Sequence, residues 1–425
     1  MYCDKGILFG EALVKSLKEK FYFPDSDSNG NKRLFFDNSG GSLRLKGAVE
    51  AKSMLEQYPD CPDRSHSKAK ILKEIVERGT REILEIIFSA KSGSLISELT
   101  ASQTMFHIVG LIMENVSGTN AVVSSLEHPS AFDAVRYYSK KTGMEMRVIP
   151  ANPKTGEIEP ESVAQLIDEN TTLLSITAAS NVCGVITDLS AVVKAARKIK
   201  PDLFIISDMV QHAPHCNIDV EALGLDGANF APYKFFGVRG CGFAYVSPRV
   251  AKFPHHKLIE KAESEFALGT SSPGNFAAAI EIINYVCEIG SKFIQSDDKK
   301  MLFSEGMKRI HLQERALLYR LLEGTPEIPG LRHIKGVTVY TDSLDLSRRD
   351  LIAAIGIDGY TSTECSKEFE KRGVIVCDRS IDSMYSSRIV KALDIPGCVR
   401  VSPLHCHTAE DIDTFLKITA DIANF

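Results

Sequence analysis

The chain has 425 residues, with 44% apolar and 25% charged side chains and a formal net charge of −5. This length predicts two domains, and the mixed charges contain no basic run of the kind that binds nucleic acid. No stretch approaches the ~20 apolar residues of a membrane span, so we expect neither a membrane nor a nucleic-acid partner. We expect a globular protein that acts on a small molecule.

Residues 1–33 predict an N-terminal helix followed by a polar arm. The segment is amphipathic and charged, and it lacks the basic start and the apolar core of a signal peptide. Ten cysteines are scattered along the chain without any C-x-x-C pair, which is typical of reduced thiols and offers no zinc cage. We therefore predict a cytoplasmic protein without a bound metal.

Short β-branched runs alternate with helical stretches between residues 105 and 246. Repeated β-α-β units of this kind predict a mostly parallel sheet with helices on both faces, and we assign residues 34–290 to this large domain. The expected order is a strand and loop at 120–130, a helix at 131–143, a strand at 144–152, a helix at 159–170, a strand at 171–180, a helix at 188–200 and a strand at 203–211.

Polar side chains follow three of these strands. In open parallel sheets, ligands bind outside the carboxyl ends of the strands. The rule selects His128, Asn181, Asp208 and Gln211, which we expect to converge on one crevice.

Residues 291–425 predict a smaller α+β domain. A long helical stretch at 298–323 is followed by short apolar runs and by a final helical pattern.

Lys234 lies in the stretch NFAPYKFFGVRGCGFAYV, residues 229–246, among aromatic and small apolar residues. Burial lowers the pKa of an amine and makes it a nucleophile at neutral pH. The alternative is a lysine that packs its methylenes on apolar surface with its amine in water. Asp208 ends an apolar run, where an acid needs a cation or donor unless it caps a helix.

The motifs around these residues resemble the class V aminotransferase group of fold-type I pyridoxal-phosphate (PLP) enzymes. This group includes cysteine desulfurases, selenocysteine lyases, carbon–sulfur lyases and isopenicillin N epimerase-like proteins. The resemblance covers about residues 34–280 and 370–420. The motifs, in the family's order, are LFFDNSGGS, TASQTMFHIV, EHPS, SNVCGVITDL, DMVQ, the lysine block, ALGTSSP and VRVSPLHCHTAEDID.

The resemblance implies a PLP fold-type I enzyme and a role for each residue around Lys234. Lys234 is expected to form the Schiff base with PLP and then to transfer protons. Asp208 is expected to pair with the pyridinium nitrogen, so that the ring acts as an electron sink. Gln211 would hydrogen-bond the phenolic oxygen, Asn181 would approach the same side of the ring, and His128 would stack on its face.

The phosphate is expected against the turn TASQ, where Ser102 and the backbone amides of Ser102 and Gln103 open a helix. An ordinary N-cap is the alternative for Ser102. The resemblance places Gly269 and Thr270 at the phosphate of a neighbouring subunit, which implies a homodimer with shared sites.

Substrate binding is expected to involve Arg400, which matches the family's arginine for the α-carboxylate. A surface ion pair with Asp411 or Asp413 is the alternative. Arg64 and His66 resemble an active-site entrance segment, although exposed loop residues fit them equally well.

The chain departs from the family pattern at three places. The phosphate turn has Ala-Ser-Gln in place of Gly-Thr-Thr. APYK replaces Ser-x-His-Lys, so Ala231 cannot contribute a hydroxyl to phosphate binding. In the region where a desulfurase carries its persulfide cysteine, Cys377 ends an apolar run, and we favour a small buried hydrophobe over a nucleophile there.

These features predict a PLP enzyme that acts on an α-amino acid through an external aldimine and an α-carbanion. We favour a desulfurase-like carbon–sulfur lyase that works by α,β-elimination without the persulfide loop. The alternative is a class V aminotransferase or an epimerase like isopenicillin N epimerase. A nucleotide-binding oxidoreductase is disfavoured because GVRGCG has the wrong spacing and position for a dinucleotide fingerprint. Intact Lys234 and Asp208 disfavour a non-enzymatic scaffold.

Overall fold

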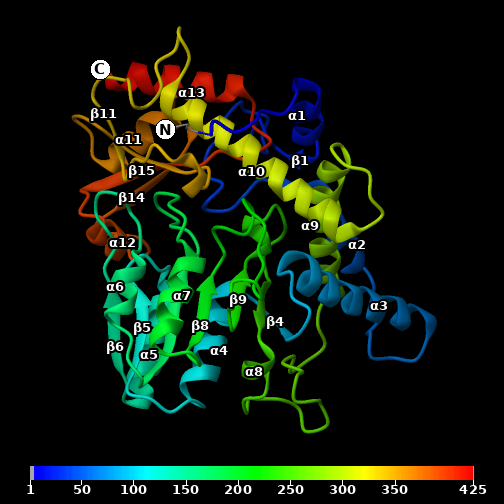
Figure 1. Cartoon of the computed structure of the whole chain (residues 1–425). Coiled ribbons are helices and arrows are strands. Elements are labelled where there is room, and N and C mark those ends of the chain that lie inside the picture. The colour runs from blue at the N-terminus through cyan, green and yellow to red at the C-terminus, as the bar shows by residue number, and fades with distance from the viewer. Residues whose placement is uncertain (1–3, 425) are drawn as a thin grey trace.

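A seven-stranded sheet forms the centre of the computed structural model, which describes residues 4–424 (Figure 1). Five neighbouring strands run parallel, and β10 is antiparallel to both of its neighbours. The strands, in spatial order, are β4 (Ser94–Glu98), β10 (Gly242–Val246), β9 (Gly227–Phe230), β8 (Phe204–Asp208), β7 (Thr171–Thr177), β5 (Asn120–Ser124) and β6 (Glu145–Ile149).

Helices cover both faces of this sheet because successive side chains of a strand point to opposite faces. In β5, Ala121 and Val123 pack with the helices α4 and α5, whereas Val122 packs with α7 on the other face. These strands therefore read as continuous apolar runs. The helices of this part are α2 (Lys46–Leu55), α3 (Ser67–Glu82) with a π-helical turn (Ile83–Ile87), α4 (Ala101–Met113), α5 (Pro129–Thr142), α6 (Pro160–Ala164), α7 (Leu189–Ile199), α8 (Pro248–Ala251) and α9 (Pro273–Ser291).

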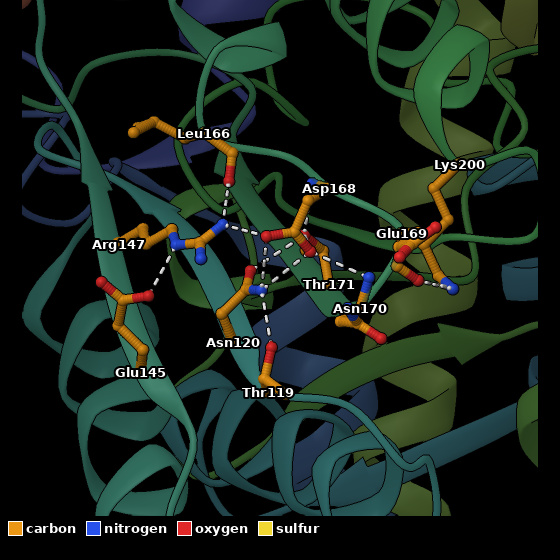
Figure 2. Close-up of polar contacts among 10 residues, drawn as sticks. All are labelled: Thr119, Asn120, Glu145, Arg147, Leu166, Asp168, Glu169, Asn170, Thr171 and Lys200. Atoms are coloured by element: carbon orange, nitrogen blue, oxygen red, sulfur yellow. Dashed lines mark hydrogen bonds and ion pairs between the residues drawn. The ribbon is translucent and has the colours of Figure 1, made fainter.

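A network of polar side chains lies at the end of the sheet where β5 and β7 begin (Figure 2). Asp168 accepts hydrogen bonds from Asn120 at 3.1 Å and from Arg147 at 2.7 Å. The backbone N–H of Asp168 donates to the hydroxyl of Thr171 at 2.9 Å, and its carboxylate accepts from the N–H of Asn170. These bonds form a turn, so the helix expected over 159–170 is shortened to α6.

A four-stranded antiparallel sheet forms the smaller part of the fold, in the order β11-β12-β15-β14. Its strands are β11 (Val337–Tyr340), β12 (Ala353–Ile357), β15 (Gly397–Val401) and β14 (Cys377–Ser380). Its helices are α10 (Lys299–Glu323), α11 (Ser362–Lys371), α12 (Ser387–Ala392) and α13 (Ala409–Ala423). The predicted combination of a large α/β part with a smaller α+β part is confirmed.

The N-terminal segment packs against the smaller part. Helix α1 (Glu11–Lys18) ends at Lys18, which pairs with Asp411 of α13 at 2.9 Å. Strand β2 (Leu34–Phe35) pairs in parallel with β13 (Val374–Ile375), and Phe36 is buried in the apolar core of the smaller part. Strands β1 (Phe21–Tyr22) and β3 (Arg44–Leu45) pair with each other. The domain boundaries at 33 and 290 stay a prediction.

None of the helices among residues 4–424 combines the length and apolar character needed to cross a membrane.

Candidate active site

A cavity of about 210 Å³ lies where the parallel strands end. The connections after β5, β7, β8 and β9 all reach it, as expected for the carboxyl edge of a parallel sheet. Predicted site residues that line it are Ser102, His128, Asn181, Asp208, Gln211 and Lys234.

Lys234 lies in a single helical turn, Pro232–Lys234, directly after β9. Its side chain is buried, with 8% exposed. Burial, together with the positive charges of Arg400 and Arg379, lowers the pKa of the amine to about 7. Much of the amine is therefore neutral and nucleophilic near pH 7. This disfavours the alternative in which Lys234 keeps its charged amine in water.

Asp208 is the last residue of β8 and is buried beside the same cavity. Burial raises the pKa of its carboxyl, while the backbone N–H of Val210, at 3.0 Å, and the charge of Lys234 act against that rise. No helix begins at Asp208, so the helix N-cap alternative is wrong.

His128 follows β5 and caps the N-terminus of α5. Its Nδ1 atom accepts the backbone N–H of Ser130 at 3.2 Å and lies 2.7 Å from the Ser130 hydroxyl. Burial and the charge of Lys234 lower the pKa of the imidazole to about 3, so the ring is neutral. The ring of Tyr385 stacks on His128, with 6.4 Å between the ring centroids.

Two amide oxygens in the cavity wall lack partners. Asn181 Oδ1 and Gln211 Oε1 are buried and accept no hydrogen bond from the described residues. A buried polar atom without a partner is unfavourable, and a polar group in the cavity would relieve it. The amide nitrogen of Gln211 lies 3.4 Å from the Ser39 hydroxyl and 3.5 Å from His215 Nε2.

The N-terminus of α4 faces the cavity through Thr100, Ala101 and Ser102. The N-cap is Thr100, whose hydroxyl accepts the backbone N–H of Gln103 at 3.1 Å. The N-cap alternative for Ser102 is therefore wrong. The backbone N–H of Gln103, which was expected to bind the phosphate, already donates to the Thr100 hydroxyl. The amides of Ala101 and Ser102 belong to the first turn, which has no intrahelical acceptors.

Two further arginines lie near the ring of Tyr233, which also lines the cavity. Arg239, a lining residue, lies over the ring of Tyr233 at 4.3 Å, and Arg44 lies 5.9 Å from the same ring. Burial and the charge of Arg239 lower the pKa of Arg44 to about 10. A Cβ atom on Gly41 would come within 3.0 Å of Arg239, so glycine keeps this space open. Arg239 and the N-terminus of α4 line the same cavity, and a cation beside a helix N-terminus forms a site for an anion.

Arg400 is completely buried on β15. Its guanidinium donates to the carbonyl of Asn181 at 2.9 Å and forms an ion pair with Asp37. The surface ion pair considered from the sequence is wrong, because Asp411 pairs with Lys18 and Asp413 with Arg320.

The other predicted residues lie away from this cavity. Gly269 and Thr270 line a separate open hollow of about 560 Å³, where Thr270 donates to Asp63 at 2.8 Å. Arg64 and His66 follow Asp63 in the sequence, and both are exposed. His66 caps α3 by accepting the backbone N–H of Ala69. The role of Gly269 and Thr270 at a phosphate shared across a dimer stays a prediction, and so does the role of Arg64 and His66 at the entrance for the substrate.

Cys377 is half-buried at the start of β14, and its Sγ lies 3.4 Å from the carbonyl of Asp378. No cysteine is found among the described residues that line the cavity.

Sequence reasoning missed Arg239 and Arg379. Arg239 stands in the glycine-rich turn after the lysine, and a basic residue in such a turn beside a cofactor site was the available signal. Arg379 lies two residues after Cys377, with no motif to identify it.

Comparison with known proteins identifies the family. The model of the family described as "Aminotransferase class-V" matches residues 34–415. A "Probable cysteine desulfurase" of Halalkalibacterium halodurans is 24% identical over 94% of this chain and 96% of its own. One of Borreliella burgdorferi is 26% identical over 70% of this chain and 75% of its own.

A solved structure has the same fold along nearly the whole chain. The apo cysteine desulfurase of Thermococcus onnurineus NA1 has a TM-score of 0.79 and 20% sequence identity, and the match covers 96% of this chain and 98% of that one. Because the fold is shared and the family model spans most of the sequence, the chain belongs to the class V aminotransferase family of PLP-dependent, fold-type I enzymes.

Proposed function

We propose that this protein binds PLP at Lys234 and cleaves a carbon–sulfur bond of a cysteine-like α-amino acid by α,β-elimination. One observation carries the proposal: a buried amine with a pKa near 7 and a buried carboxylate line the same cavity. Such strongly perturbed groups in one cleft are typical of catalytic sites.

The residues of the cavity fit PLP in several respects. Asn181 and Gln211 offer buried oxygen atoms without partners, and their amide groups suit polar groups on a ring. The amides of Ala101 and Ser102, with Arg239, suit a phosphate. Asp208 suits a protonated ring nitrogen, because its negative carboxylate would form a charged hydrogen bond with the positive N–H of the ring.

When bound, PLP supplies an electron sink that stabilises negative charge at the substrate α-carbon. Arg400 holds the α-carboxylate and so fixes the orientation of the substrate. Lys234 Nζ takes the α-proton, and Asp208 holds a proton on the ring nitrogen. The electrons of the Cα–H bond form the Cα=Cβ bond, and those of the C–S bond leave with sulfur. Water then converts the released enamine to pyruvate and ammonia.

Among residues 4–424, no cysteine belongs to the cavity wall, which supports elimination over persulfide transfer. Cys377 belongs to a strand, where its backbone is held by pairing with β15.

We expect borohydride reduction of the PLP-loaded protein to leave one pyridoxyl group, on the peptide that contains Lys234. Incubation with L-cysteine is expected to release pyruvate, measured by a coupled assay, together with sulfide. Incubation with cystine is expected to release pyruvate together with cysteine persulfide, because both sulfur atoms leave with the broken C–S bond. Conversion of the cofactor to its pyridoxamine form, without pyruvate, would assign the protein to the aminotransferases. A pyridoxyl group on another lysine would contradict the proposed site.

We also expect the rate of PLP capture by the cofactor-free protein to rise with pH through about 7 and then to level off. Capture needs the neutral amine, and the pKa of Lys234 is lowered to about 7, so the neutral fraction grows only up to that region. An ordinary lysine would gain neutral amine up to about pH 10. The visible absorbance, followed by stopped flow at a series of pH values, measures this. A rate that still rises above pH 9 would contradict the lowered pKa.

A further inference from the structure

Strands β14 and β15 bring two arginines to one face of the small sheet. Arg379 lies opposite Cys398, and Cys377 lies opposite Arg400. Opposed residues of antiparallel strands share a face, as do residues two positions apart. All four side chains therefore lie on the same face. Arg379 and Arg400 are diagonal neighbours, with about 7–8 Å between such positions.

This face lies beside the proposed catalytic residues, behind the described lining of the cavity, which includes neither the two arginines nor Cys377. Arg400 reaches across to the carbonyl of Asn181, which lines the cavity. The positive charge of Arg379 lowers the pKa of both Lys234 and His128, so its guanidinium lies within electrostatic reach of the cavity. In Figure 1 both strands lie above the loops that follow the large parallel strands.

The two arginines differ in how their charges are matched. Arg400 is paired with Asp37. A third arginine, Arg388, also has partners, because it donates to the backbone carbonyls of Ser125 and Glu127. Within residues 4–424, the half-buried side chain of Arg379 has neither an ion pair nor a hydrogen bond, and its Nε atom is buried. A buried donor without an acceptor is unfavourable, and a guanidinium can bind a planar oxyanion through two parallel hydrogen bonds.

We propose that Arg379 forms a second anion subsite, which binds an oxyanion on the substrate's side chain while Arg400 binds the α-carboxylate. The substrate class is therefore cysteine-like α-amino acids whose sulfur-containing side chain carries an oxyanion, and the side-chain carboxylate of L-aspartate serves as a probe of this subsite. This inference rests on the proposed function, because it takes the α-amino acid to be bound at Arg400. It adds that Arg379 determines specificity.

The first test compares isosteric amino acids that differ in charge. Spectral titration of the PLP-loaded protein is expected to show L-aspartate binding about 10- to 100-fold tighter than L-asparagine. Arg379→Gln should remove this ratio and leave L-asparagine affinity within about threefold, and Arg379→Lys should restore part of it because charge returns without the planar fork. Arg136→Gln, a change of an exposed arginine, is the control.

Equal affinities of wild-type protein for aspartate and asparagine would overturn the subsite and leave the proposed function standing. Loss of both ligands equally in Arg379→Gln would also overturn it, because Arg379 would then hold the α-carboxylate. Circular dichroism shows whether the variant folds, and the wild-type comparison does not depend on that variant.

A second test is independent of PLP. Succinate, a dicarboxylate without an amine, is expected to raise the Tm of the cofactor-free protein, and Arg379→Gln should abolish the shift. No shift in wild-type protein would overturn the subsite. A normal succinate shift without a pyridoxyl group on Lys234 would overturn the proposed function alone.

Discussion

Replacing Lys234 by alanine is expected to abolish the pyridoxyl adduct and to lower turnover by about 10³-fold or more. The cavity lining contains no second lysine among the described residues. No other lysine amine in this lining can therefore bind PLP or take the α-proton. Visible absorbance measures cofactor capture, and pyruvate release measures turnover.

The control for this variant is Lys194→Ala, which removes an exposed lysine of α7. We expect it to keep the visible absorbance and the turnover of the wild-type protein. A Lys234→Ala protein that still forms a covalent adduct and releases pyruvate would show that the nucleophilic amine lies elsewhere.

The position of the site could be predicted from the sequence because it depends on a repeated local pattern. Continuous apolar runs separated by amphipathic stretches specify parallel strands, and parallel strands end at one edge of the sheet. His128, Asn181 and Asp208 each follow or end such a run, and the structure brings all three to one cavity. The predicted lengths were less accurate, since the turn around Asp168 ends α6 early.

The parts of the site that depend on the packing of distant segments could not be predicted in this way. Arg379 becomes part of the cavity's charge environment only because β14 pairs with β15. Asp37 pairs with Arg400, although 363 residues separate them in sequence. Neither fact leaves a periodic signal.

Asp208→Asn is expected to lower turnover by about 10²–10³-fold while PLP still binds at Lys234. The asparagine keeps the shape of the side chain and an oxygen that can accept the N–H of Val210, so the fold and the cavity should persist. It removes the negative charge that would hold a proton on the ring nitrogen, and without that proton the ring accepts electrons poorly. Turnover and equilibrium binding of PLP, measured on the same sample, separate the two effects.

The variant also has an electrostatic consequence that a purely structural role for Asp208 does not share. The carboxylate of Asp208 favours the charged form of Lys234, so its removal should lower the pKa of that amine and shift the pH midpoint of PLP capture downward. Arg379→Gln removes a positive charge near the same amine and should shift the midpoint upward. Midpoints that move in the same direction in both variants would contradict the charge arrangement around Lys234. A fully active Asp208→Asn protein would contradict the role of Asp208 itself.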